Sequence, residues 1–190
     1  SMFDEEADRL DAVRREANCD ALTGLANRSY FMARLRETVA ADDSSGGAVF
    51  IARLANLATV NQTLGRDATD ELLRAYGEAL AEVARKYPEG LAARLNGADF
   101  ALLVPALASP QETAHQLLQS LVQVASAYLP EYPSTWLGCG HFPRGVETAA
   151  ILAQVDAALA AVEAEGRNGM RLVDMRQGDE APRSSEEWSN

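Results

Sequence analysis

The middle of this sequence contains Arg94-Leu95-Asn96-Gly97-Ala98-Asp99-Phe100, which joins two short apolar runs over residues 91–95 and 100–104. An Asn-Gly pair between two apolar runs is the strongest short-range signal for a β-hairpin. We therefore predict two antiparallel strands with a tight turn at Asn96 and Gly97. Asparagine can occupy a left-handed turn conformation nearly as well as glycine, so Asn96 is compatible with this turn.

Helical and extended patterns alternate on both sides of this hairpin. Apolar residues at spacings of three and four predict helices over residues 3–17, 29–39, 56–64, 67–86, 110–128 and 147–165. Short apolar or β-branched runs predict strands over residues 48–54, 134–142 and 170–175. This order predicts an α/β (α+β) domain with a single central sheet and helices on its faces.

The composition excludes several classes of protein. The chain has 190 residues, of which 47% are hydrophobic and 24% charged, as in an ordinary globular domain. Its net charge of −11 argues against a nucleic acid or an anionic membrane as the main partner. Cys19 and Cys139 lie far apart and predict two reduced thiols in a reducing compartment. No apolar run approaches the ~18 residues needed to cross a bilayer.

Four blocks of sequence together resemble one family. They are Asp20-Ala21-Leu22-Thr23-Gly24-Leu25-Ala26-Asn27-Arg28, then Asn61 to Leu73, then Arg94 to Phe100, and finally Asp156 to Asn168. In this order and spacing they resemble the GGDEF domains, the diguanylate cyclases that join two GTP molecules into cyclic di-GMP. The resemblance covers residues 20–175. It implies a mostly antiparallel sheet of the palm type found in nucleotidyl cyclases.

The resemblance also implies that the metal site has been altered. The family holds two Mg²⁺ ions with an aspartate at the end of the first strand and with the acidic fourth residue of its signature. Here the first of these positions is Arg53, and the family's next aspartate falls on Ala55. Arginine offers only donors and no lone pair to a metal. The signature itself reads as a degenerate version of the family motif, Asn96-Gly97-Ala98-Asp99-Phe100, so we expect no catalytic residue, no bound metal and no cofactor.

The nucleotide-binding positions are only partly kept. A family lysine that faces phosphate falls on Glu163 and another on Ala58, whereas Arg167 keeps a phosphate-side cation. The two positions that read the guanine edge fall on Asn61 and Asp70. Those two residues are either a vestigial guanine site or groups that stabilise local turns and a helix start. The family's inhibitory R-x-x-D motif falls on Tyr87 and Gly90, so we predict that this site is lost.

Three other side chains receive ordinary structural interpretations. We predict that His115 lies at the surface or its boundary, that His141 holds no metal, and that Trp136 belongs to the core.

The resemblance further implies a division of the chain. Residues 1–18 are similar to a signalling helix with coiled-coil character, residues 19–176 to a degenerate GGDEF domain, and residues 177–190 to a polar linker toward a C-terminal EAL-like domain. Together they resemble LapD-type receptors, inner-membrane proteins whose cytoplasmic GGDEF–EAL pair senses cyclic di-GMP. We therefore expect an inactive regulatory module that contacts the upstream helix and the EAL-like domain. Its first helix offers a homodimer contact, and it binds GTP weakly or not at all. A GTP-binding switch without turnover and a weak diguanylate cyclase are the alternatives.

Overall fold

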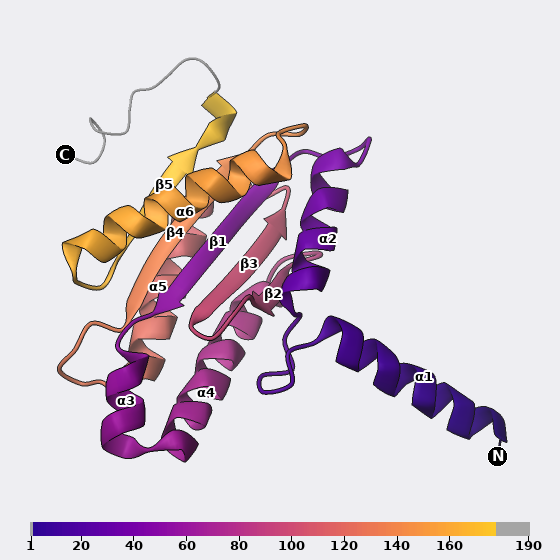
Figure 1. The fold of residues 1–190 in the computed structure, drawn as a ribbon. Helices are drawn as coiled ribbons and strands as arrows, with labels where there is room; N and C mark the ends of the chain where they lie inside the picture. Colours follow the sequence, from indigo (N-terminus) through magenta and orange to yellow (C-terminus); the bar gives the residue numbers. More distant parts are fainter. Residues whose placement is uncertain (1, 178–190) are drawn as a thin grey trace.

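The computed structural model describes residues 2–177 as a single five-stranded sheet between helices, in the strand order β2-β3-β1-β4-β5 (Figure 1). Strand β1 (Gly47–Leu54) pairs antiparallel with β3 (Asp99–Pro105) and β4 (Thr135–Phe142). Strand β2 (Leu91–Arg94) pairs antiparallel with β3, and β5 (Gly169–Asp174) runs parallel to β4. The predicted fold class is confirmed. Strand β1 is central because its apolar run is buried on both faces of the sheet.

The predicted hairpin joins β2 to β3, and its turn does not use the left-handed conformation that Asn96 could occupy. Among the described residues, left-handed backbone angles outside glycine occur at Asn56, Glu89 and Ala106, and neither Asn96 nor Gly97 has a positive φ. Instead the Asn96 side chain closes the turn, because its Oδ1 accepts the backbone N–H of Asp99 at 3.2 Å. This is the role that asparagine often plays at the first position of a turn.

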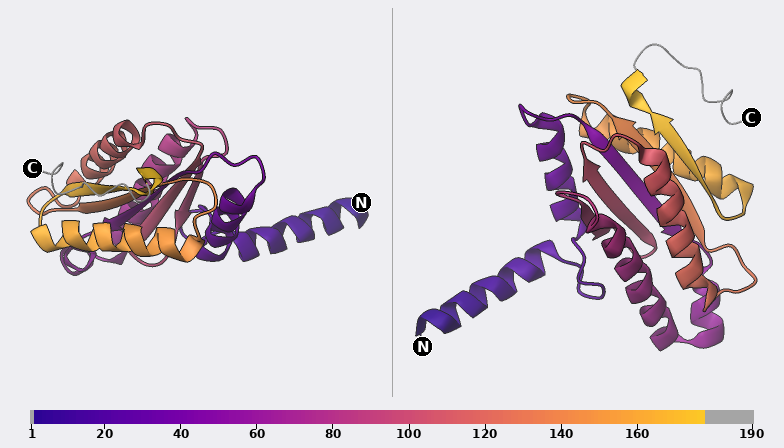
Figure 2. Two further views of the ribbon diagram at one scale, coloured as in Figure 1. Left: turned by 90° about the horizontal axis from the view of Figure 1, so that it is seen from above. Right: turned by 180° about the vertical axis from the view of Figure 1, so that it is seen from behind.

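Helices cover both faces of the sheet, giving three layers (Figure 2). Helices α4 (Arg66–Ala84) and α5 (Pro110–Ser126), together with the short α3 (Leu57–Leu64), close one core, which contains Phe50, Tyr76, Leu102 and Leu117. Helices α2 (Arg28–Ala40) and α6 (Thr148–Glu165) close the other core, which contains Phe31, Val49, Leu103 and Leu159. Alternate side chains of β1 and β3 enter these two cores, as the pleat of a strand requires.

Helix α1 (Met2–Asn18) projects away from the layers and buries none of its residues (Figures 1 and 2). Its apolar stripe is exposed, including Phe3, Leu10 and Val13. The chain then turns back, and the Asn27 side chain caps α2 by accepting the N–H of Tyr30 at 3.0 Å. The helix predicted at residues 3–17 is therefore present, while its coiled-coil role stays a prediction.

The described part of the chain ends in a short 3₁₀ turn, η1 (Met175–Gln177), which the sequence patterns did not indicate. The predicted linker lies outside the described residues from residue 178 onward. Within residues 2–177, no helix has both the length and the apolar character needed to span a membrane. His115 is exposed and both cysteines are free, as predicted. Trp136 packs only partly buried against the second core, and its indole Nε1 has no hydrogen-bond partner among the described residues.

Candidate functional site

The sheet register brings Arg53 and Asp99 together. Arg53 on β1 lies directly opposite Asp99 on β3, so the two side chains project from the same face of the sheet. The guanidinium donates twice to the carboxylate, from Nε to Oδ1 at 2.8 Å and from Nη2 to Oδ2 at 2.9 Å. This parallel two-bond arrangement is the strongest geometry available to an arginine–carboxylate pair.

Helix α6 supplies the third member of this group. Glu163 lies in the last turn of α6, and its Oε1 accepts a hydrogen bond from Arg53 Nη1 at 2.8 Å. We call Arg53, Asp99 and Glu163 the arginine cluster. Hydrogen bonds to Asp99 first, and then to Glu163, raise the pKa of Arg53 above its ordinary value despite its partial burial. The guanidinium therefore stays charged and is shared between a strand and a helix.

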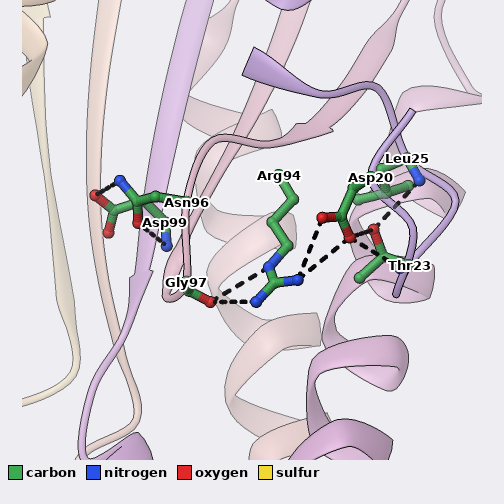
Figure 3. Close-up of polar contacts among 7 residues, drawn as sticks. All are labelled: Asp20, Thr23, Leu25, Arg94, Asn96, Gly97 and Asp99. Atoms are coloured by element: carbon green, nitrogen blue, oxygen red, sulfur yellow. Dashed lines mark hydrogen bonds and ion pairs between the residues drawn. The ribbon is translucent and has the colours of Figure 1, made fainter. Parts of the chain in front are cut away.

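A second ion pair holds the other side of the hairpin loop (Figure 3). Arg94 Nη1 lies 3.3 Å from both carboxylate oxygens of Asp20, and Arg94 Nη2 donates to the Gly97 carbonyl at 3.0 Å. The hydroxyl and the backbone N–H of Thr23 also donate to Asp20, at 2.8 and 2.9 Å. Burial alone raises the pKa of Asp20, but the hydrogen bonds from Thr23 and the charge of Arg94 outweigh it, so the pKa falls below its usual value.

This second ion pair was not predicted from the sequence. A local signal was present, because an aspartate followed three residues later by threonine often forms a side-chain-stabilised turn. Arg94 itself lies in the hairpin stretch. Its pairing with Asp20 joins residues 74 positions apart, which no local pattern indicates.

The proposed guanine-edge residues lie on neighbouring helices. Asn61 is exposed on α3, and Asp70 is half-buried in the second turn of α4. Thr69 links the two helices, because its hydroxyl lies 3.4 Å from Asn61 Oδ1 and also donates to the Gly65 carbonyl at 3.0 Å. This contact suits a local stabilising role for Asn61, while its exposed amide leaves the guanine interpretation open.

The remaining predicted positions lie around the arginine cluster or far from it. Ala55 is buried just after β1, and Ala58 lies in α3. Arg167 is exposed beyond the end of α6 and forms an ion pair with Glu165 at 3.9 Å. In the signature, Asn96 and Gly97 are exposed, Ala98 is half-buried, and Phe100 is fully buried against Tyr76 with ring centroids 5.1 Å apart.

The positions of the predicted inhibitory motif belong to the connection between α4 and β2. The Tyr87 hydroxyl pairs with the Thr113 hydroxyl of α5 at 2.6 Å. Gly90 packs so closely that an added Cβ would lie 2.3 Å from the Ala84 carbonyl oxygen. Both positions are thus occupied by packing contacts within the domain.

The arginine cluster does not fit a divalent cation. Mg²⁺ takes oxygen ligands in a strict octahedral arrangement. Both oxygens of Asp99 already accept from Arg53, and a fixed positive charge lies between the two carboxylates. Nowhere within residues 2–177 do three or more histidine, cysteine, aspartate or glutamate side chains gather in a way that could hold a metal ion.

Comparison with known proteins identifies the family. The family model described as "Diguanylate cyclase, GGDEF domain" matches residues 17–169. The chain belongs to the GGDEF family. The diguanylate cyclase DgcS of Shewanella oneidensis is 26% identical to this GGDEF domain over 159 residues, which is 83% of the chain and 53% of DgcS.

Two solved structures show the same fold as this GGDEF domain. The coiled coil and GGDEF domain of DgcB from Caulobacter crescentus, in complex with c-di-GMP, aligns with a TM-score of 0.76 at 24% identity, covering 90% of this chain and 94% of that one. The S helix-GGDEF-EAL structure of Vibrio cholerae LapD, bound to c-di-GMP, aligns with a TM-score of 0.73 at 19% identity, covering 98% of this chain and 44% of that one. The chain also spans between 16% and 42% of the length of three further curated relatives.

Proposed function

We propose that this GGDEF domain is a catalytically inactive regulatory module of a cyclic di-GMP signalling protein. The observation that carries the proposal is the position of Arg53, which is held by Asp99 and Glu163 where the family resemblance expects metal-binding carboxylates. Asp99 is the only acidic residue of the signature, and both of its carboxylate oxygens are engaged.

Charge supports the same conclusion for both the metal ion and the GTP phosphates of the family reaction. Arg53 repels a metal ion, and Glu163 repels the phosphates that a lysine at its position would attract. One pair of unit charges at ~4 Å is worth about 4 kcal/mol at an effective dielectric of ~20. Exchanging attraction for repulsion at two positions therefore weakens Mg²⁺–GTP binding severely, even though solvent screens part of each effect.

The proposal extends to the arrangement of the whole protein. We infer a signalling helix at residues 1–18, a degenerate GGDEF domain at residues 19–176, and a linker at residues 177–190 that leads to an EAL-like domain. The exposed apolar stripe of α1 supports a helix that pairs with a partner. The likeness to LapD, whose solved chain includes an S helix and an EAL domain, supports this order. The proposed location is the cytoplasmic side of an inner-membrane protein.

The proposal is tested by calorimetric titration with Mg²⁺–GTP and by an assay for cyclic di-GMP synthesis. We expect no saturable heat and no product. The double variant Arg53→Asp/Glu163→Lys restores a carboxylate and a lysine at no change in net charge, and it should gain measurable GTP binding. The matched control is Arg85→Asp/Glu78→Lys, which reverses an exposed ion pair of 2.9 Å and should gain none.

Two outcomes would favour the alternatives. Saturable binding to the unaltered chain without product would indicate a GTP-binding switch, for which the exposed Asn61 amide offers a base contact. Cyclic di-GMP synthesis that Asp99→Ala abolishes would identify a weak diguanylate cyclase and overturn the proposal.

A further inference from the structure

The hairpin loop lies between two ion-pair groups that belong to distant parts of the chain. On one side, Arg94 links the Gly97 carbonyl to Asp20, which lies two residues after the end of α1 (Figure 3). On the other side, Asp99 holds Arg53, which in turn holds Glu163. These polar contacts, joined by the loop backbone from Gly97 to Asp99, therefore connect the turn behind α1 to the last turn of α6.

The first end of this connection is firmly attached to α1. The N–H of Cys19 donates to the Arg15 carbonyl at 2.8 Å, so the helical hydrogen bonding continues up to the residue before Asp20. The Asn27 side chain donates to the Ala17 carbonyl at 2.9 Å, and the N–H of Asn27 donates to the Asn18 carbonyl at 2.9 Å. A change in the direction of α1 therefore moves the turn that carries Asp20.

The second end contains a contact that breaks more easily than the Arg53–Asp99 pair beside it. Asp99 receives two hydrogen bonds from Arg53, and its side chain is 14% exposed, whereas Glu163 receives one and is 42% exposed. An exposed single-bond contact contributes less to stability than a shielded two-bond pair. The loop can thus release the end of α6 while Arg53 and Asp99 stay together.

We propose that the hairpin loop couples α1 mechanically to the last turn of α6, with the Arg53–Glu163 contact as the joint that opens and closes. This inference rests on the proposed function, since it assigns the signature residues to signal transmission in place of nucleotide chemistry. The turn after α6 leads through Gly166 into β5, so motion at this joint is passed toward the C-terminal side of the domain.

The test is amide hydrogen exchange on the whole 190-residue chain. Asp20→Asn removes the charge that holds Arg94, and Glu163→Gln removes the charge at the joint. Each should speed exchange in residues 160–166 at least about threefold, a coupling near the lower limit for residues in one network. Arg94→Gln breaks the first contact from the hairpin side and should reproduce the effect of Asp20→Asn.

The decisive comparison is a double-mutant cycle, because spatial continuity alone does not establish coupling. In the Glu163→Gln background, Asp20→Asn should have no further effect on residues 160–166. The matched control is Glu165→Gln, which removes a similarly exposed carboxylate two residues further along; in that background, Asp20→Asn should keep its full effect.

Two results would overturn the coupling. One is an exchange rate in residues 160–166 that stays unchanged in both Asp20→Asn and Arg94→Gln. The other is a double variant Asp20→Asn/Glu163→Gln whose rate increase equals the product of the two single increases. Neither readout depends on GTP. Synthesis of cyclic di-GMP by the unaltered chain would instead contradict the proposed function and leave the exchange results as they are.

Discussion

At the scale of single residues, Arg53 organises the candidate site. Its guanidinium offers several donors in one plane, so it can satisfy a strand carboxylate with two bonds and a helix carboxylate with a third. Removing it would leave Asp99, a mostly shielded carboxylate, without a cation. The loss of Arg53 therefore lowers the free energy of unfolding by more than the ion pair itself contributes, because Asp99 keeps an uncompensated charge.

We expect Arg53→Met to lower the free energy of unfolding by about 1–3 kcal/mol in urea denaturation, since charged hydrogen bonds to a shielded group are lost. The control is Arg85→Met, whose ion pair with Glu78 has both side chains more than 60% exposed. Such a surface pair contributes about 0–1 kcal/mol. Equal losses in the two variants would contradict a structural role for the arginine cluster.

At the scale of elements, the close seating of α6 on β4 determines where Glu163 lies. An added Cβ at Gly138 would come within 2.7 Å of the Val155 carbonyl oxygen and 2.9 Å of the Leu159 N. The helix backbone therefore packs directly on the strand at this point. Because Glu163 is one turn further along the same helix, this contact sets its distance from Arg53.

We predict that Gly138→Ala destabilises the fold by about 1–3 kcal/mol, because the new methyl must displace the backbone of α6. The same variant should also speed exchange in residues 160–166. Gly97→Ala is the comparison, since nothing lies within 4 Å of the added Cβ and the φ of Gly97 is not positive. Its effect should stay within about 0.5 kcal/mol. A Gly138→Ala variant with an unchanged free energy of unfolding would show that α6 has room to shift.

At the scale of the whole molecule, the stability of the domain should depend on pH through His141. The imidazole of His141 is buried, with Nε2 2.8 Å from the Leu107 carbonyl oxygen. Asp174 and Arg176 also face the ring. Burial lowers the pKa of His141 most, Arg176 lowers it further, and the Leu107 carbonyl and Asp174 oppose these effects without cancelling them. The unfolded chain therefore takes up a proton at a higher pH than the folded chain does.

This sign predicts that the free energy of unfolding falls as the pH drops from above 6.5 toward the lowered pKa of His141. Urea denaturation between about pH 7.5 and pH 5.5 should show the decline, because carboxylates with ordinary pKa values stay ionised over this range. His141→Gln should flatten it. His115→Gln changes the chain's other histidine, which is exposed, and should leave the slope unchanged. A slope that persists in His141→Gln would show that other titrating groups cause the pH dependence.

Much of the fold was predictable because its signals are local. The apolar run over residues 48–54 is long enough for one buried strand, and the observed β1 differs from it by a single residue. The Asn-Gly turn predicted the hairpin correctly, although Asn96 does not use the left-handed conformation that is open to it. The Asn96 side chain stabilises the turn instead, by accepting a hydrogen bond from the backbone N–H of Asp99.

By itself, the sequence determined the order of the elements, the hairpin, and the charges at the positions where the family resemblance predicts metal and phosphate contacts. The tertiary structure alone decided that these charged side chains form ion pairs with one another. Arg53 meets Asp99 across 46 residues because the register of β1 and β3 aligns them, and it meets Glu163 across 110 residues because α6 sits on β4. Strand register and helix seating are set by the packing of the whole core, so no local stretch of sequence carries the information.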